Sequence, residues 1–214
     1  MKKILLLACT IISFATITQA QIKKGSVLLG GSFGFSKNEY EADANEGKTK
    51  SFLAYPSAGV AIKDNWIIGL SGGLSGTRYK PEVSGNTYKS NGFSSGLFVR
   101  RYMSLSKSFY LYGNAGISYN KSESEERHIS DYTRNIAVQG VSFSVTPGIT
   151  YAVNNHFHLE AALNNLLNLS YNKNIEERVS SGDKYKTESK TFDYGTNFSN
   201  AAPLTIGFRF VLGK

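Results

Sequence analysis

The chain has 214 residues, with 24 Lys and Arg against 16 Asp and Glu, a formal net charge of +8 and one cysteine. A single cysteine excludes a disulfide framework or a thiolate metal site within the chain. The basic residues are spread over polar stretches that also hold acids. This mixture is typical of solvated loops and argues against nucleic acid as a partner.

The first twenty residues have the three parts of a secretory signal peptide. Lys2 and Lys3 precede an apolar run that starts at Ile4, and small residues occupy positions 18 and 20. This order predicts cleavage before Gln21, so residues 1–20 are the signal peptide and residues 21–214 form one domain. No apolar run of about 18 residues follows, which excludes a transmembrane helix.

The remaining chain shows a period of two in its apolar residues, which is typical of strands and not of helices. In residues 204–212, for example, Leu204, Ile206, Phe208 and Phe210 share one face. The pattern recurs about eight times. It predicts strands at residues 25–36, 51–62, 66–77, 91–103, 108–119, 139–153, 156–171 and 198–213.

The connections between these strands alternate in length. Long polar connections are expected at residues 36–50, 80–90, 120–138 and 172–197, and short ones at 63–65, 104–107 and 154–155. Short turns at one rim and long loops at the other are typical of outer-membrane barrels. Pro56 and Pro147 lie within predicted strands, and each is expected to cause a bulge or a local break because proline lacks the backbone donor.

The two faces of the predicted strands indicate which one meets lipid. The first face is apolar, and the second is mostly Gly, Ser, Thr and Asn with few charges. A soluble lipid carrier would need a charged outer surface, so that alternative is disfavoured. The predicted fold is all-β: an eight-stranded antiparallel up-and-down transmembrane β-barrel whose apolar face contacts lipid.

Several segments resemble the OmpA/OmpX-like small outer-membrane β-barrels, a porin-family-like group of Gram-negative bacteria. They are residues 55–70, 96–102, 111–117 and 157–160, which are spread over most of the chain. The resemblance implies a location in the cell outer membrane and a role in envelope integrity or in presenting loops to the exterior. It implies no enzymatic activity.

Three charged residues are expected to share one layer of the lumen. Strand alternation points Arg100, Glu160 and Arg209 inward, each four to five residues from the short-turn rim or from the C-terminus. We expect Glu160 and Arg209 to meet directly across neighbouring strands, with Arg100 reaching from the opposite wall. A structural ion cluster is favoured over a gate or proton path, because a barrel of eight strands is normally filled by side chains.

Other chemistry is not supported by the sequence. His128, His156 and His158 lack a converging third ligand, so no metal site is expected, and no catalytic residue or cofactor site is predicted. The expected function is that of a non-enzymatic structural or surface-interaction protein. A small passive pore is the main alternative, and an outer-membrane enzyme a less favoured one. The expected partners are outer-membrane lipid, the barrel assembly machinery and an unidentified loop partner, and the protein is expected to be a monomer.

Overall fold

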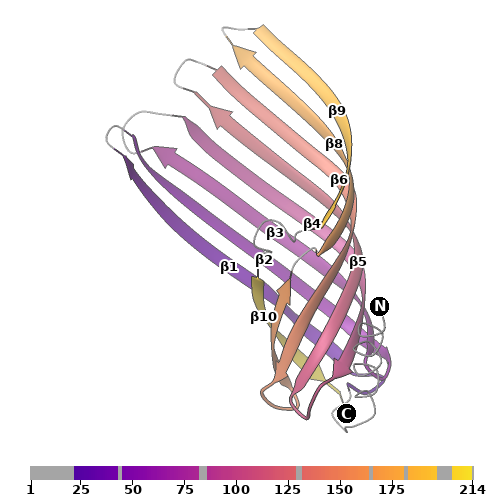
Figure 1. Cartoon of the computed structure of the whole chain (residues 1–214). Coiled ribbons are helices and arrows are strands. Elements are labelled where there is room, and N and C mark those ends of the chain that lie inside the picture. The colour runs from indigo at the N-terminus through magenta and orange to yellow at the C-terminus, as the bar shows by residue number, and fades with distance from the viewer. Residues whose placement is uncertain are drawn as a thin grey trace, which may run out of the picture.

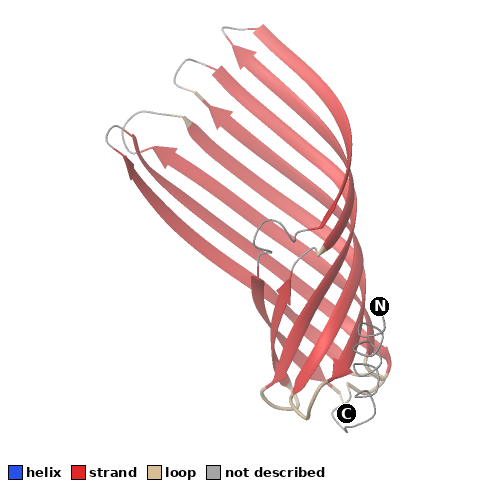
Figure 2. Cartoon of the chain, viewed as in Figure 1, coloured by secondary structure: helices blue, strands red, loops and turns tan. Residues whose placement is uncertain are grey.

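The computed structural model describes residues 22–42, 45–81, 86–128, 132–163, 166–180, 183–196 and 204–213. These residues form ten strands, and the strands dominate the views in Figures 1 and 2. Their bounds are β1 Val27–Ala42, β2 Asn45–Lys63, β3 Trp66–Pro81, β4 Thr87–Ser104, β5 Phe109–Arg127, β6 Tyr132–Ala152, β7 Phe157–Leu163, β8 Leu167–Ser180, β9 Asp183–Thr196 and β10 Leu204–Leu212. No helix in these ranges is long and apolar enough to cross a membrane.

The strands close into an eight-stranded antiparallel barrel, which confirms the predicted fold class. Hairpin neighbours pair from β1 through β6, β6 pairs with β7, β7 with β10, and β10 with β1. The sheet extends beyond the closed barrel through β8 and β9, which continue the wall above β7 and β10 (Figure 1). The predicted strand at residues 156–171 therefore spans β7 and the start of β8, β9 lies within the expected loop at residues 172–197, and β10 lies within the predicted strand at residues 198–213.

Both mid-strand prolines coincide with interruptions in the backbone ladder, as predicted. Pairing between β2 and β3 stops after Ala54 and resumes at Ser57, which skips Pro56. On β6, pairing with β8 ends at Val145 and pairing with β7 begins at Gly148, which brackets Pro147. A missing N–H removes one ladder bond, so each ladder is interrupted on one side of the strand only. On the other side Pro56 stays in register with Gly31, and Pro147 with Gly113.

The four expected long loops are wrong. Apart from Asn86 and His128, the described residues of those ranges are strand, because the hairpins on that rim continue beyond the apolar band. For instance, β1 and β2 stay paired to Ala42 and Asn45. The ends of the predicted strands marked where the apolar alternation stopped. Polar residues above the lipid still satisfy their backbone groups by pairing, so the hydrogen-bonded ladder does not end where hydrophobicity ends.

The outer wall of the barrel is the apolar face, in agreement with the predicted lipid face. Leu70 is 63% exposed and Leu159 is 43% exposed, while the alternate positions face inward. Inside, glycines make room for large rings. A Cβ on Gly69 would lie 2.6 Å from the ring of Phe98, so only glycine allows that ring to lie against β3. Small residues on one strand thus permit aromatic residues of another to fill the narrow lumen.

Candidate functional site: the barrel lumen

The structure brings Arg100, Glu160 and Arg209 together inside the barrel. They belong to β4, β7 and β10 respectively and are buried, with exposed fractions of 8%, 7% and 2%. Strand alternation explains why each side chain points inward, because all three share the parity of the lumen-facing residues on their strands. The barrel closure then joins β7 to β10 and brings β4 opposite them.

Glu160 is held by both arginines at once. The Arg209 Nε and Nη2 atoms donate to Glu160 Oε1 and Oε2 over 2.9 and 3.1 Å, a two-pronged contact between neighbouring strands. The Arg100 Nη1 atom donates to both carboxylate oxygens over 2.9 Å from the opposite side. Two guanidinium groups stabilise the charged form of this carboxylate, and such charge-assisted bonds are the strong ones.

One carboxylate leaves a surplus positive charge, and tyrosine side chains accommodate it. The Tyr102 hydroxyl donates to Glu160 Oε1 over 2.8 Å and accepts a hydrogen bond from Arg100 Nη1 over 3.0 Å. The Arg100 guanidinium also lies 4.2 Å from the ring centroid of Tyr112, close enough for a cation–π contact. Further hydrogen bonds run from Arg100 Nε to Asn114 and from Arg209 Nη1 to Ser57.

Below the ion cluster, apolar side chains fill the short-turn end of the barrel. The rings of Tyr102 and Tyr110 meet edge to face at 6.1 Å, and Leu28 and Ile67 are fully buried beside them. The segment before β1 closes this rim. Ile22 is buried, and its backbone N–H donates to the Asn65 side chain while its carbonyl accepts from the Asn65 N–H. The short-turn end is consequently packed by side chains and covered by chain.

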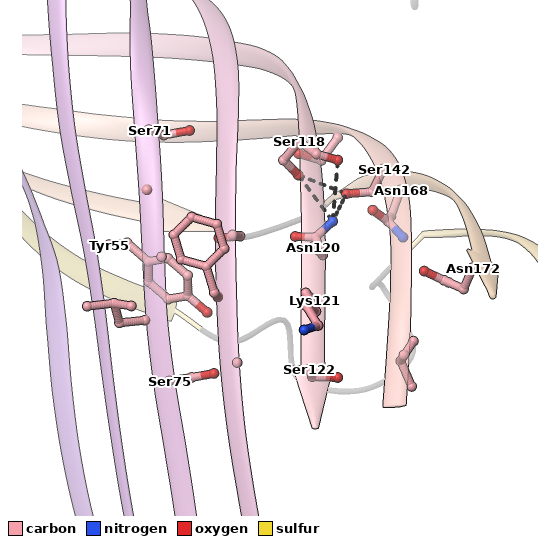
Figure 3. A pocket seen from close by; sticks show the side chains of 18 of the residues that line it. Tyr55, Ser71, Ser75, Ser118, Asn120, Lys121, Ser122, Ser142, Asn168 and Asn172 are labelled. Carbon is pink, nitrogen blue, oxygen red and sulfur yellow. Dashed lines mark hydrogen bonds between the residues drawn. The ribbon is translucent and has the colours of Figure 1, made fainter. Parts of the chain in front are cut away.

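On the hairpin side of the ion cluster, the lumen opens into a polar cavity of about 430 Å³. Figure 3 shows its wall of hydroxyl and amide side chains, with the ring of Tyr55 on one side. Asn120 Nδ2 donates to Ser142 Oγ over 2.9 Å, and Ser118 and Ser142 are hydrogen-bonded at 3.0 Å. Serine and asparagine provide most of this wettable wall, with Lys121 at its edge, which agrees with the prediction of a polar lumen face with few charges.

The histidines do not form a metal site within the described residues, where no group of three or more His, Cys, Asp or Glu side chains converges. His158 is buried and stacks on Tyr110 at 6.0 Å, and its Nδ1 atom makes no hydrogen bond to a described residue. His128 lies far along β5's hairpin, 3.2 Å from Glu126. His158 therefore serves as an aromatic packing residue.

Sequence reasoning missed the tyrosines of the site. Tyr102 lies two residues beyond Arg100 and shares its inward face, and Tyr110 and Tyr112 alternate on the inward face of β5. The alternation of residues along β4 and β5 could therefore have predicted that these tyrosines point into the lumen. The hydrogen bond between Tyr102 and Glu160 could not be predicted from the sequence, because their distance depends on how β4 and β7 face each other across the closed barrel.

The closed antiparallel barrel, its apolar outer wall and its polar, plugged interior define the class of integral outer-membrane β-barrel proteins. The chain matches the family model of the outer membrane protein beta-barrel domain over residues 5–198, and it belongs to this family. Membership in the group of small outer-membrane barrels and location in the cell outer membrane, both predicted from sequence, are confirmed.

Two solved outer-membrane proteins are similar to this chain. The outer membrane protein OprG from Pseudomonas aeruginosa is similar with a TM-score of 0.53 at 14% identity, over 90% of this chain and 98% of that chain. A major outer membrane protein from Thermus thermophilus has a TM-score of 0.49 at 10% identity, over 88% of this chain and 99% of that one. No curated protein matches the chain in sequence. At such identities the likeness to OprG shows the fold alone.

Proposed function

We propose that the protein is a non-enzymatic barrel that is closed to transport and holds four long β-hairpins at the cell surface, where they support the envelope or bind an external partner. The observation that carries this proposal is the filled short-turn end of the lumen. A path for solutes would have to cross the layer of Arg100, Glu160 and Arg209 and then the rings packed below it. Buried ions with every partner in place hold such a layer rigid.

Planar-bilayer recording tests the closed state. We expect purified wild-type protein to give no steady single-channel conductance above the membrane baseline. Glu160→Gln should increase transient openings, because it removes the carboxylate that holds both arginines of the cluster. Glu123→Gln is the matched control, since Glu123 is an exposed residue of the same barrel paired with Lys121 at 2.9 Å. Steady wild-type conductance would contradict the proposal.

A small passive pore is the second candidate, and the cavity of about 430 Å³ on the hairpin side favours it. Its polar wall would suit small hydrophilic solutes if the ion cluster moved aside. Liposome swelling with sugars of increasing size separates the two functions. A closed barrel gives no swelling at any size, whereas a pore gives swelling that falls with solute size and increases in Glu160→Gln.

The absence of enzymatic activity belongs to the same proposal. The lumen offers paired ions, tyrosines and serines, and the assigned partners of Glu160 leave it no free role as a base. Outer-membrane lipid and the barrel assembly machinery are the proposed partners of the barrel, and a monomer is the proposed state. Light scattering of the protein in detergent tests the monomer, which a dimer mass would overturn.

A further inference from the structure

Four cations form a continuous row across the outer surface of β1 to β4. The strand register places Lys37 directly opposite Lys50, Lys50 opposite Arg78, and Arg78 opposite Lys89. Adjacent strands are about 4.8 Å apart, so the row is roughly 14 Å long. We call these four residues the cation row.

The row is poorly compensated by acids. Lys50, Arg78 and Lys89 are exposed, and no carboxylate of a described residue lies in ion-pair contact with any of them. Lys37 contacts Glu39 at 2.6 Å. Lys89 is followed on β5 by Glu125, but that carboxylate is paired with Arg127.

Neighbouring residues extend the basic surface. On the same outward face, two residues closer to the hairpin tips, Lys80 lies opposite Lys48. Lys80 has no acidic contact among the described residues. Glu39, which contacts Lys37, lies opposite Lys48 on the side of the cation row that faces away from the apolar band.

The row borders the surface that contacts lipid. The next outward positions toward the barrel include Phe35 opposite Phe52, and the positions after those include Leu74 opposite Phe93. These rings and aliphatic side chains are about half exposed or more. The cations consequently lie where hydrocarbon gives way to headgroups on the hairpin side of the membrane.

Like charges directly opposite each other destabilise a sheet, so the three successive cations without an acidic contact, Lys50, Arg78 and Lys89, favour binding of an external anion. We propose that the cation row binds the phosphate groups of lipid headgroups in the leaflet on the hairpin side. Phosphate fits because it is anionic at neutral pH, offers several acceptor oxygens and stands at the height of the row in any phospholipid or phosphorylated glycolipid. The choice of lipid over a free polyanion rests on the continuity of the row with the apolar band.

A charge-matched pair of variants tests the proposal in the full-length barrel. The test variant is Lys50→Gln/Arg78→Gln/Lys89→Gln. The control variant is Lys184→Gln/Lys186→Gln/Lys190→Gln, which removes three exposed cations from the outward face of β9, on the same side of the membrane. The probes are vesicles of phosphatidylcholine alone and of phosphatidylcholine with phosphatidic acid, and spin-labelled lipid reports the association constant of each headgroup with the protein.

We expect the wild-type protein to prefer phosphatidic acid over phosphatidylcholine, and the test variant to lose this preference by on the order of tenfold or more, since each cation near an anionic surface strengthens binding several-fold. The control variant should keep most of it, and salt should weaken the wild-type preference. Unfolding in urea gives a second test, because the expected change in stability has opposite directions in the two kinds of vesicle. The test variant should be as stable as wild type or more so in phosphatidylcholine, where only repulsion is lost, and less stable than wild type in the anionic vesicles.

Two results would overturn the proposal. One is an equal loss of preference in the test and control variants, which would mean that net charge and not the row attracts the lipid. The other is competition by inorganic pyrophosphate at concentrations comparable to those of the lipid, which would identify a site for soluble anions. If the test variant does not fold, Lys50→Gln alone with the salt titration of the wild type gives the same comparison.

Discussion

Replacing Glu160 by glutamine is the most informative perturbation of the lumen. The substitution keeps the shape of the side chain and removes its charge. It leaves the guanidinium groups of Arg100 and Arg209 facing each other without the carboxylate that both now contact at 2.9 Å. Arg100 would keep its contacts with Tyr102 and Asn114, and Arg209 would keep the hydrogen bond to Ser57.

The expected loss follows from the burial of these groups. Deleting one partner of a buried ion pair typically costs about 3 to 5 kcal/mol, because the remaining charge is left without compensation. Because Glu160 pairs with two arginines, we expect a loss of stability in the upper part of that range. The water-accessible cavity on the hairpin side lowers the cost, since water reaching the cluster would solvate the freed guanidinium groups.

A double-mutant cycle in lipid vesicles measures the interaction. Urea unfolding midpoints should fall strongly in Glu160→Gln, and adding Arg209→Met should recover part of the loss, since one of the two opposed cations is gone. The coupling free energy between the positions should be about 1 to 3 kcal/mol. Strictly additive effects would refute the reasoning, because they would mean that Glu160 and Arg209 do not interact in the membrane-embedded protein.

Three further predictions concern location and orientation. Val145→Arg should destabilise the barrel by about 2 to 4 kcal/mol in folding titrations, because it places a charge in lipid. Ser144→Asn on the lumen face should have a small effect. If Ser144→Arg cost more stability than Val145→Arg, the assignment of the two faces would be reversed. Epitope tags at Asn45 and Asp183, next to the hairpin tips, should be labelled on intact cells, and labelling only after permeabilisation would invert the topology. Intact-mass measurement of envelope protein should find a mature chain starting at Gln21, and a lipidated chain starting at Cys9 would contradict this.

Much of the ion cluster could be predicted from the sequence because it depends on parity. Side chains alternate across a strand, so an arginine at position 100 and a glutamate at position 160 fall on the small, polar face whatever the exact strand ends. When an inner face carries only a few charges, those charges are expected to form ion pairs, because burying a charge without a partner is costly. The participation of Tyr102 was not predicted, because its hydroxyl reaches Glu160 only through the shape of the closed barrel.

The hairpin extensions could not be predicted from hydrophobicity. Above the lipid, β8 and β9 carry charged residues on both faces, and ion pairs such as Lys173 with Glu188 at 2.9 Å join them. Apolar alternation reports where a strand meets hydrocarbon. It carries no information on how far the ladder continues in water, where any sequence without proline can keep pairing.

The sequence by itself determined the class of fold, the face that meets lipid and the inward direction of Arg100, Glu160 and Arg209, because a period of two assigns every residue of a strand to one side. Only the tertiary structure decided the register between strands and which strands meet where the barrel closes. Register places Lys50 between Lys37 and Arg78, and closure joins β7 to β10. Both depend on pairing between segments that are distant in sequence. A shift of two residues keeps every side chain on its face, so apolar alternation alone does not select one register.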